Sequence, residues 1–275
     1  MKPLFQYWHF NSGMMILVLV AAGFYLAVSK LKLRKGAVVF FSGLLLMALM
    51  ESSPLHFLAM HHLFSAHMII HVVILLIGAP LMVWGWPHGL PGIEKNKASF
   101  SRFASRYPWL CWLCGVGIMW FWHIPMIFNL SGNMHAGHSG LLPLLQPFSL
   151  MVAGMIFAWP LIGPVKECRV DPLHGILYLF MACMGCSLLG LLLTFAPAEL
   201  FPHPEMAGVP GLSEFVGNQW SMTPQADQQI SGLIMWVPCC FIYIAGSLFL
   251  LRLWFGEKEI SAGQDKDDLL MTIGK

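Results

Sequence analysis

The chain has 275 residues, of which 57% are hydrophobic and only 10% are charged, and its mean hydropathy is +0.70. About a quarter of the residues in an ordinary soluble domain are charged, so this composition excludes one and predicts an integral membrane protein. The formal net charge of +2 offers no electrostatic footprint for nucleic acid, so no nucleic-acid partner is expected. Among the polar residues, the 12 histidines stand out.

Seven apolar segments are long enough to cross a bilayer as helices. They predict an all-α, polytopic membrane protein that forms a single helical bundle. The predicted spans are 12–29, 36–52, 58–84, 108–128, 142–163, 173–197 and 226–255, followed by a cytoplasmic tail at 256–275. Pro54 and the histidines after it also allow a short interfacial helix over 54–63, with the third span then starting nearer Phe64.

Basic residues follow alternate segments. Of the 15 Lys and Arg residues, 14 follow the first, third, fifth and seventh segments, and only Lys2 lies on the other side. The positive-inside rule then places the N-terminus outside and the C-terminus in the cytoplasm. This orientation puts ten of the 12 histidines in the outer half, which suggests a cation site facing the periplasm or exterior.

His67 and His71 are four residues apart in the third segment and therefore project from one face of a helix. Two imidazoles at this spacing can bind one metal ion. The thioethers of Met60, seven residues before His67, and of Met68 are additional soft donors. The histidines could instead ligate haem or hydrogen-bond a quinone. They could also hydrogen-bond to neighbouring helices and only hold the bundle together.

A third histidine, His123, lies near the outer end of the fourth segment, in the run Trp122-His123-Ile124-Pro125. Because Pro125 has no N–H, the carbonyl four residues before it loses its helical partner, and the local bend can turn His123 into the bundle. His123 is therefore a candidate third ligand beside His67 and His71.

Other polar residues gather at the same outer end and are candidates for supporting the ligands. Asp227 lies in the first helical turn of the seventh segment, where a carboxylate also complements the helix dipole, and Gln228 follows it. Either residue could orient a histidine ligand through a hydrogen bond. The remaining supporting candidates are Glu51, His61 and His62.

Two further groups could capture or pass on a metal ion. The outer loop after the fourth segment contains His135 and His138 on a glycine-rich turn. Cysteine pairs with i,i+3 spacing lie inside the fourth and sixth segments, and thiols within a membrane favour Cu(I). The alternative is that small thiols only fill helix contacts. The pairs are Cys111 with Cys114 and Cys183 with Cys186, and Cys239 and Cys240 are adjacent in the seventh segment.

Several of these motifs occur together in one known family. Over most of its length, and in order, the chain resembles the seven-helix CtaG type of cytochrome c oxidase assembly proteins, the assembly factors of caa3-type oxidases. The matching runs are His67-Met68-Ile69-Ile70-His71, Ala79-Pro80-Leu81 with Gly85-Trp86-Pro87, Trp122-His123-Ile124-Pro125, and the ten residues from Asp227 to Trp236.

The resemblance implies that the chain lies in a bacterial plasma (inner) membrane and helps to mature a haem–copper oxidase by supplying or inserting copper. We therefore expect a copper chaperone rather than an enzyme, and the sequence has no phosphate loop and no hydrolase motif. Its expected partners are a membrane subunit of the oxidase, the lipid bilayer and a periplasmic copper donor. The alternatives are a haem-binding or quinone-reactive redox protein and an assembly scaffold without a cofactor. A metal transporter is less well supported, because its inner half would need more polar residues.

Overall fold

The computed structural model describes residues 8, 12–30, 35–61, 63–129, 142–197, 200–201 and 223–273. Every regular element in these residues is helical. The elements are α1 Ser12–Val28, α2 Lys35–Ser52, α3 Pro54–His61, α4 Phe64–Val73, the π-helix η2 Ile74–Gly78, α5 Ala79–Trp84, α6 Pro91–Arg106, α7 Pro108–Trp122, α9 Leu142–Ile162, the 3-10 helix η3 Lys166–Cys168, α10 Pro172–Phe195 and α12 Pro224–Ile273.

Four of the described helices are long and apolar enough to cross a membrane: Phe64–Trp84, Leu144–Ile162, Pro172–Phe195 and Pro224–Gly256. A fifth is added if α2 and α3 count as one span bent by 52°. Two further apolar helices, α1 and α7, are shorter. The protein is thus an all-α membrane protein with several spans, and each of the seven segments predicted from the sequence contains one of these apolar helices.

The third predicted span, 58–84, differs from the structure at its start. Residues 54–61 form the separate helix α3, and the span itself begins at Phe64. The alternative drawn from the sequence, a short separate helix before a span that starts nearer Phe64, is therefore the correct description of these residues. As a consequence, Met60 belongs to a different helix from His67. Their spacing of seven residues therefore does not place the two side chains on the same face of one helix.

The fourth predicted span, 108–128, is also shorter in the structure, because α7 ends at Trp122. His123 caps this end with φ −100° and ψ 6°, and its N–H bonds the carbonyl of Trp120 instead of continuing the α-helical pattern. Pro125 cannot donate a backbone hydrogen bond, which accounts for the stop just before it. At the other end of the chain, α12 continues to Ile273, beyond the predicted span end at 255.

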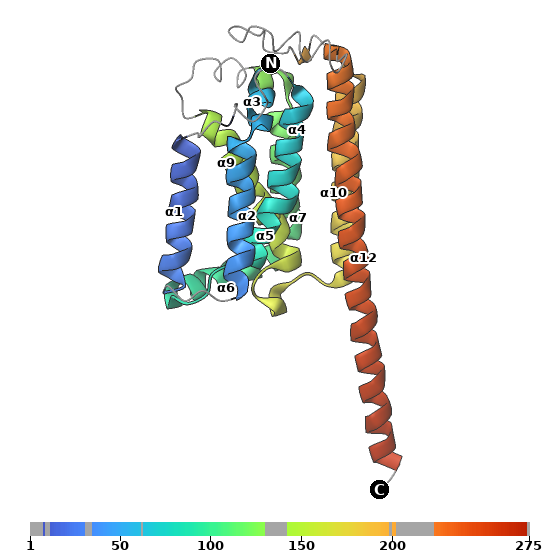
Figure 1. Cartoon of the computed structure of the whole chain (residues 1–275). Helices are drawn as coiled ribbons and strands as arrows, with labels where there is room; N and C mark the ends of the chain where they lie inside the picture. The colour runs from blue at the N-terminus through green and yellow to red at the C-terminus, as the bar shows by residue number, and fades with distance from the viewer. Residues whose placement is uncertain are drawn as a thin grey trace.

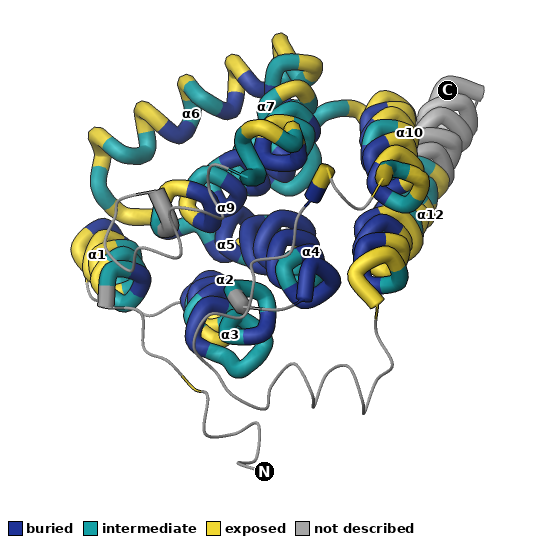
Figure 2. Tube along the Cα trace, turned by 90° about the horizontal axis from the view of Figure 1, so that it is seen from above, coloured by how far each residue is buried: buried dark blue, intermediate teal, exposed yellow. Residues whose placement is uncertain are grey.

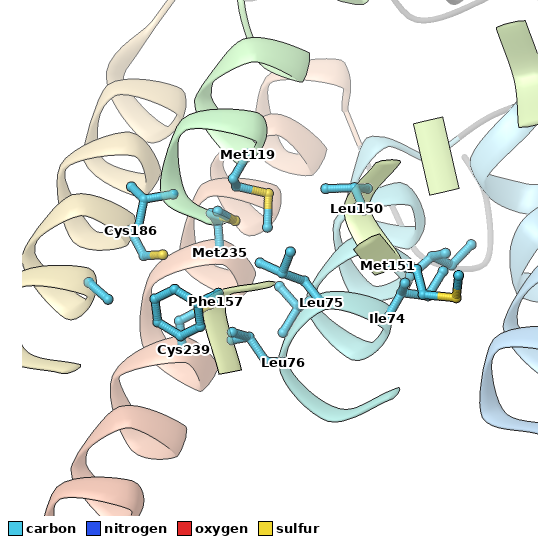
Figure 3. Packing of buried hydrophobic residues seen from close by; sticks show 14 of the residues in the cluster. Ile74, Leu75, Leu76, Met119, Leu150, Met151, Phe157, Cys186, Met235 and Cys239 are labelled. Atoms are coloured by element: carbon cyan, nitrogen blue, oxygen red, sulfur yellow. The ribbon is translucent and has the colours of Figure 1, made fainter. Parts of the chain in front are cut away.

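The helices form one bundle in which α4, η2 and α5 occupy the centre (Figures 1 and 2). In the most apolar stretch of this span 67% of the residues are buried, against 39% for α10 and 22% for α12. Apolar side chains pack together in the core, and they come from η2, α7, α9, α10 and α12 (Figure 3). Large apolar side chains such as Phe180, Phe241 and Leu248 remain exposed on α10 and α12, as expected for helices that face lipid.

The two ends of the bundle differ in chemistry. We call the end where α4 begins and α7 ends the histidine end, because His67, His71 and His123 lie there. The opposite end, called here the α6 end, is crossed by the amphipathic helix α6, which runs across the axis of the bundle (Figure 1). α12 continues past the α6 end (Figure 1).

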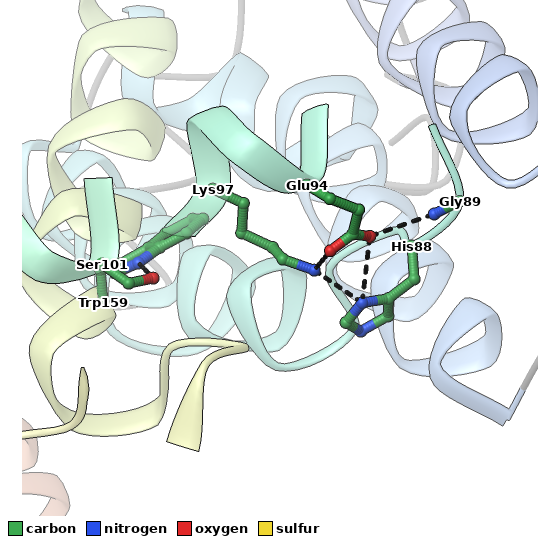
Figure 4. A network of polar contacts seen from close by, with 6 residues as sticks. All are labelled: His88, Gly89, Glu94, Lys97, Ser101 and Trp159. Atoms are coloured by element: carbon green, nitrogen blue, oxygen red, sulfur yellow. Dashed lines mark hydrogen bonds and ion pairs between the residues drawn. The ribbon is translucent and has the colours of Figure 1, made fainter. Parts of the chain in front are cut away.

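Polar contacts join α6 to the loop before it and to α9 (Figure 4). The ammonium of Lys97 forms an ion pair with the carboxylate of Glu94 and donates to Nδ1 of His88 at 2.8 Å. Glu94 also accepts the N–H of Gly89 at 3.1 Å. The indole N–H of Trp159 on α9 donates to the hydroxyl of Ser101 at 2.9 Å. The α6 end is therefore fixed by charges and hydrogen bonds beside its basic residues.

Candidate metal site at the histidine end

The helix that carries His67 and His71 is anchored by a residue far away in sequence. The side chain of Asp227, in the first turn of α12, accepts the backbone N–H of Phe64 at 2.6 Å and of Ser65 at 3.2 Å. These N–H groups belong to the first turn of α4, which has no intrahelical acceptor for them. The carboxylate is 1% exposed and also complements the helix dipole. Asp227 therefore fixes where α4 begins and how it is oriented.

Gln228, the next residue of α12, binds the end of a different helix. Its amide nitrogen donates to the carbonyl of Leu193 at 3.0 Å and to that of Ala196 at 2.6 Å, at the C-terminus of α10. From the sequence, Asp227 and Gln228 could either orient a histidine through a hydrogen bond or, for Asp227, complement the helix dipole. In the structure, the contacts described above hold the ends of helices α4 and α10.

His67 and His71 lie on one face of α4, as their spacing predicts. Their ring centroids are 4.0 Å apart with planes inclined by 57°, and the ring of His123 lies 5.7 Å from that of His71. His71 and His123 are both buried, with 3% and 4% of their surfaces exposed. The structure thus brings together three histidines from two helices that are more than 50 residues apart in sequence.

The contacts of His123 define its donor and acceptor atoms. Its Nδ1 lies 2.6 Å from the carbonyl oxygen of Met119, which can only accept, so Nδ1 carries the proton. In the neutral imidazole, Nε2 then has the free lone pair. This lone pair lies 3.2 Å from the sulfur of Met68, which is fully buried on α4. Two atoms that both bind soft metal ions therefore face each other in the core.

His67 contacts a residue that was not expected from the sequence. Nε2 of His67 lies 3.5 Å from the side-chain amide of Gln146 on α9, and Gln146 is itself buried. Aromatic rings surround the same histidine, since Phe64 stacks on it at 6.2 Å and Phe128 meets it edge-on at 5.8 Å. Phe201 packs against both phenylalanines. The signal for Gln146 in the sequence is a lone amide in an apolar segment, which must find a polar partner.

The remaining supporting candidates are placed less completely. Glu51, at the end of α2, is buried and pairs with Nδ1 of His56 on α3 at 3.4 Å. His62, His135 and His138 lie outside the described residues, and for His61 only the backbone, in α3, is described. Glu51 thus connects α2 to α3 beside the start of α4.

The thiols of α10 pair across the helix interface. The sulfur of Cys183 lies 3.0 Å from that of Cys240 on α12. The Cys186 thiol contacts Cys239 and the hydroxyl of Tyr243 on the same partner helix. From the sequence, Cys183 and Cys186 could pass on a metal ion as an i,i+3 pair or could only fill helix contacts. The i,i+3 pair on α7, Cys111 and Cys114, comes from a different helix and Cys111 packs in the core against α9.

Within the described residues, no group of three or more His, Cys, Asp or Glu side chains is arranged to hold one metal ion. The three histidines lie close together. However, Nε2 of His67 lies beside the amide of Gln146, and Nδ1 of His123 lies beside the carbonyl oxygen of Met119. A site at this end would therefore use methionine sulfur as well, or would form when the histidines reorient.

The chain was compared with known proteins. Residues 22–257 match the family model described as cytochrome c oxidase caa3 assembly factor. No curated protein and no solved structure matches the chain. The matched region contains α4, α7 and the start of α12, and so includes the three histidines, Met68 and Asp227. The family model covers well over half of the sequence, and the protein therefore belongs to the family of cytochrome c oxidase caa3 assembly factors.

Proposed function

We propose that this assembly factor binds copper as Cu(I) at the histidine end and delivers it to a membrane subunit of a haem–copper oxidase. The observation that carries the proposal is the contact between Nε2 of His123 and the sulfur of Met68, at 3.2 Å in the buried core. Both atoms offer lone pairs when the imidazole is neutral. A soft cation between them would turn this contact into a pair of ligand bonds.

His71 and His67 complete the donor set of the proposed site. The His71 ring lies between the rings of His67 and His123, with centroid distances of 4.0 and 5.7 Å. Imidazole and thioether ligands are neutral, so a site built from them carries no negative charge to trap the ion, unlike a closed thiolate site. This donor set suits a carrier that must both hold and release Cu(I).

The surroundings of the site support a rigid frame with adjustable ligands. Asp227 fixes the start of α4, and the Met119 carbonyl fixes the ring of His123. Met68 is unbranched, so its sulfur can move away from Nε2 to admit an ion. The contact of His67 with Gln146 is long, at 3.5 Å, and an imidazole rotating toward the metal would give it up.

The proposal also includes orientation and partners. All seven apolar helices cross the membrane, with the histidine end facing the periplasm, where a copper donor would load the site, and the basic α6 end in the cytoplasm. The apolar side chains exposed on α10 and α12 offer a surface on which an oxidase subunit can dock within the bilayer. The protein acts without a catalytic step of its own.

The test is the copper content of protein purified from copper-replete cells. We expect His67→Ala/His71→Ala and His123→Ala to lower Cu(I) affinity by at least about tenfold, because each variant removes ligands. Active oxidase in the membrane should fall in parallel. His88→Ala, at the α6 end, is the matched control and should leave both unchanged. In right-side-out vesicles an impermeant Cu(I) chelator should strip the site, whereas in inverted vesicles it should not.

Normal copper content in the double variant would overturn the proposal, as would a Soret band, which would identify the histidines as haem ligands. The second candidate is a scaffold without metal. It is favoured by the hydrogen bonds from His123 to Met119 and between His67 and Gln146, which satisfy these histidines inside the bundle. Protein that binds no copper while the oxidase still fails to mature in the variants would establish this second candidate.

A further inference from the structure

Halfway along the bundle, α10 and α12 pack in close contact and bring four cysteines together. Nearer the histidine end, Gly190 and Gly232 allow this approach, because a Cβ on Gly190 would lie 2.7 Å from the Gly232 carbonyl oxygen and a Cβ on Gly232 would lie 2.6 Å from that of Gly190. Toward the α6 end of the same interface, each of the two helices carries two cysteines. They are Cys183 and Cys186 on α10 and Cys239 and Cys240 on α12.

The two pairs of thiols differ in their surroundings. Cys186 and Cys239 contact each other in the closed core and are at most 2% exposed. Cys183 and Cys240 are half-buried, with their sulfurs 3.0 Å apart. The hydroxyl of Ser187 lies 3.4 Å from the Cys240 sulfur and can donate to it. Only the half-buried pair therefore combines two sulfurs, a hydroxyl donor and a route to the surface.

That route is a cavity of about 320 Å³ between the two helices. Cys183 lines it together with Tyr243 and Ser247, and the other lining residues are apolar. On α10 its lining residues run from Cys183 back to Ile176, and on α12 they run from Tyr243 on to Leu251. The cavity therefore extends from Cys183 toward the α6 end. This opening reaches the Cys183 sulfur from the lipid-facing surface, where Phe180 and Leu248 are also exposed, and leaves the closed core undisturbed.

From this geometry we propose that Cys183 and Cys240 form a second metal site, which binds one soft monovalent cation, Cu(I), between two thiolates. Both S–H bonds break, two Cu–S bonds form and two protons leave. Ser187 then donates to the Cys240 thiolate. The site is separate from the histidine end, and the inference stands on the thiol geometry whether or not the histidines bind copper.

The geometry favours Cu(I) over Zn(II) as the ion bound by this pair. Zn(II) in a structural site takes four ligands, and the described residues offer no group of three or more His, Cys, Asp or Glu around one position. Cu(I) is satisfied by two thiolates and is the softer ion. Two sulfurs at 3.0 Å need only a small rotation of each side chain to open enough for an ion between them.

The test is an anaerobic Cu(I) titration of the purified full-length protein in competition with bicinchoninate. Cys183→Ser/Cys240→Ser should lose one tightly bound equivalent of Cu(I) and the ultraviolet absorption of thiolate-bound Cu(I). Cys111→Ser/Cys114→Ser is the matched control on α7 and should keep both. The histidine variant His67→Ala/His71→Ala should also keep the absorption band, so failure of one site can be told from failure of the other.

A second measurement uses the unaltered protein and does not depend on the folding of a variant. Cu(I) added before N-ethylmaleimide should protect Cys183 and Cys240 from alkylation, mapped by mass spectrometry, and should leave Cys114 reactive. An unchanged equivalent and absorption band in Cys183→Ser/Cys240→Ser would overturn the inference. So would equal alkylation of Cys183 with and without Cu(I).

Discussion

Histidines at the two ends of the bundle have opposite surroundings. His88, at the α6 end, has a side chain 45% exposed and lies between the charges of Glu94 and Lys97. His123, at the histidine end, is 4% exposed and contacts a carbonyl oxygen and a thioether. One environment uses the imidazole within a network of charges. The other leaves a lone pair facing a soft atom, and the proposed copper site rests on that second environment.

Helix caps differ between the two ends in the same way. Asp171 caps α10 at the α6 end by accepting the N–H of Leu173 at 3.1 Å, two residues away, from an exposed position. Asp227 caps α4 from a buried position 163 residues away. The exposed cap stabilises its own helix, whereas the buried cap also joins two helices. Polar groups at the histidine end therefore carry more of the tertiary structure.

The largest expected effect comes from breaking the buried cap. Asp227→Ala leaves the N–H groups of Phe64 and Ser65 without their acceptor in the core and should lower the free energy of unfolding by about 3 kcal/mol. Asp171→Ala should cost about 1 kcal/mol, because water can replace the lost acceptor. Thermal unfolding in detergent micelles, followed by circular dichroism, measures both. Equal losses of stability in the two variants would mean that the buried and the exposed cap contribute equally.

An intermediate effect is expected at the loop that leads into α6. Gly89 has φ +155°, and a Cβ there would lie 2.5 Å from the carbonyl oxygen of Val28. Gly89→Ala should therefore cost about 2 kcal/mol through backbone strain and displacement of that carbonyl. Gly92→Ala, in the first turn of α6 with open space around it, should change stability by less than about 1 kcal/mol. The unfolding assay used for the caps applies, and a harmless Gly89→Ala would show that the close approach is not required.

The smallest effect concerns the charges at the α6 end. Burial raises the pKa of Glu94. Hydrogen bonds from Lys97 and Gly89 and the charges of Lys97 and His88 lower it by a larger amount, so its pKa lies below the ordinary value. A lowered pKa in the folded state stabilises the protein above the pKa of the unfolded state, and this contribution disappears as pH falls through the folded pKa. Because Glu94 is partly exposed, Glu94→Gln should cost less than about 1 kcal/mol near pH 7.

As pH falls through the lowered folded-state pKa of Glu94, the effect of the substitution should disappear, because the carboxyl is then protonated in both states. Raising the salt concentration near neutral pH should also reduce the difference. Unfolding midpoints of the two proteins across this pH range check the prediction. A difference that grows toward low pH would contradict the assigned sign.

The all-α fold and the family could be predicted from the sequence because hydropathy and motif order are local signals. The spacing of His67 and His71 placed them on one face of a helix, since that depends only on helical periodicity. The link with His123 could be proposed but not demonstrated, because it requires α4 and α7 to pack with these residues at one depth. The break before Phe64 also depends on tertiary structure, since Asp227 caps α4 there.

Partners on distant helices were beyond the sequence. Gln146 was not expected beside His67, because nothing local shows which face of α9 meets α4. The cysteines are a similar case: the i,i+3 pattern drew attention to Cys183 with Cys186, whereas Cys183 meets Cys240 across an interface set by the approach of two glycines. A pattern along one helix gives the direction of a side chain, and the helix packed against it determines the contact.

The π-helix Ile74–Gly78 lies within the central span, between α4, which carries His67 and His71, and α5. A π-turn is equivalent to an α-helix with one residue inserted, and here it is followed by Pro80, which cannot donate a backbone hydrogen bond. The wider turn takes up this extra residue, so the residues on either side stay close to the facing that an uninterrupted α-helix would give them. A residue added within regular α-helix would instead rotate His67 and His71 by about 100° relative to α5. The π-turn therefore lets this span carry one more residue while its imidazoles still lie near His123.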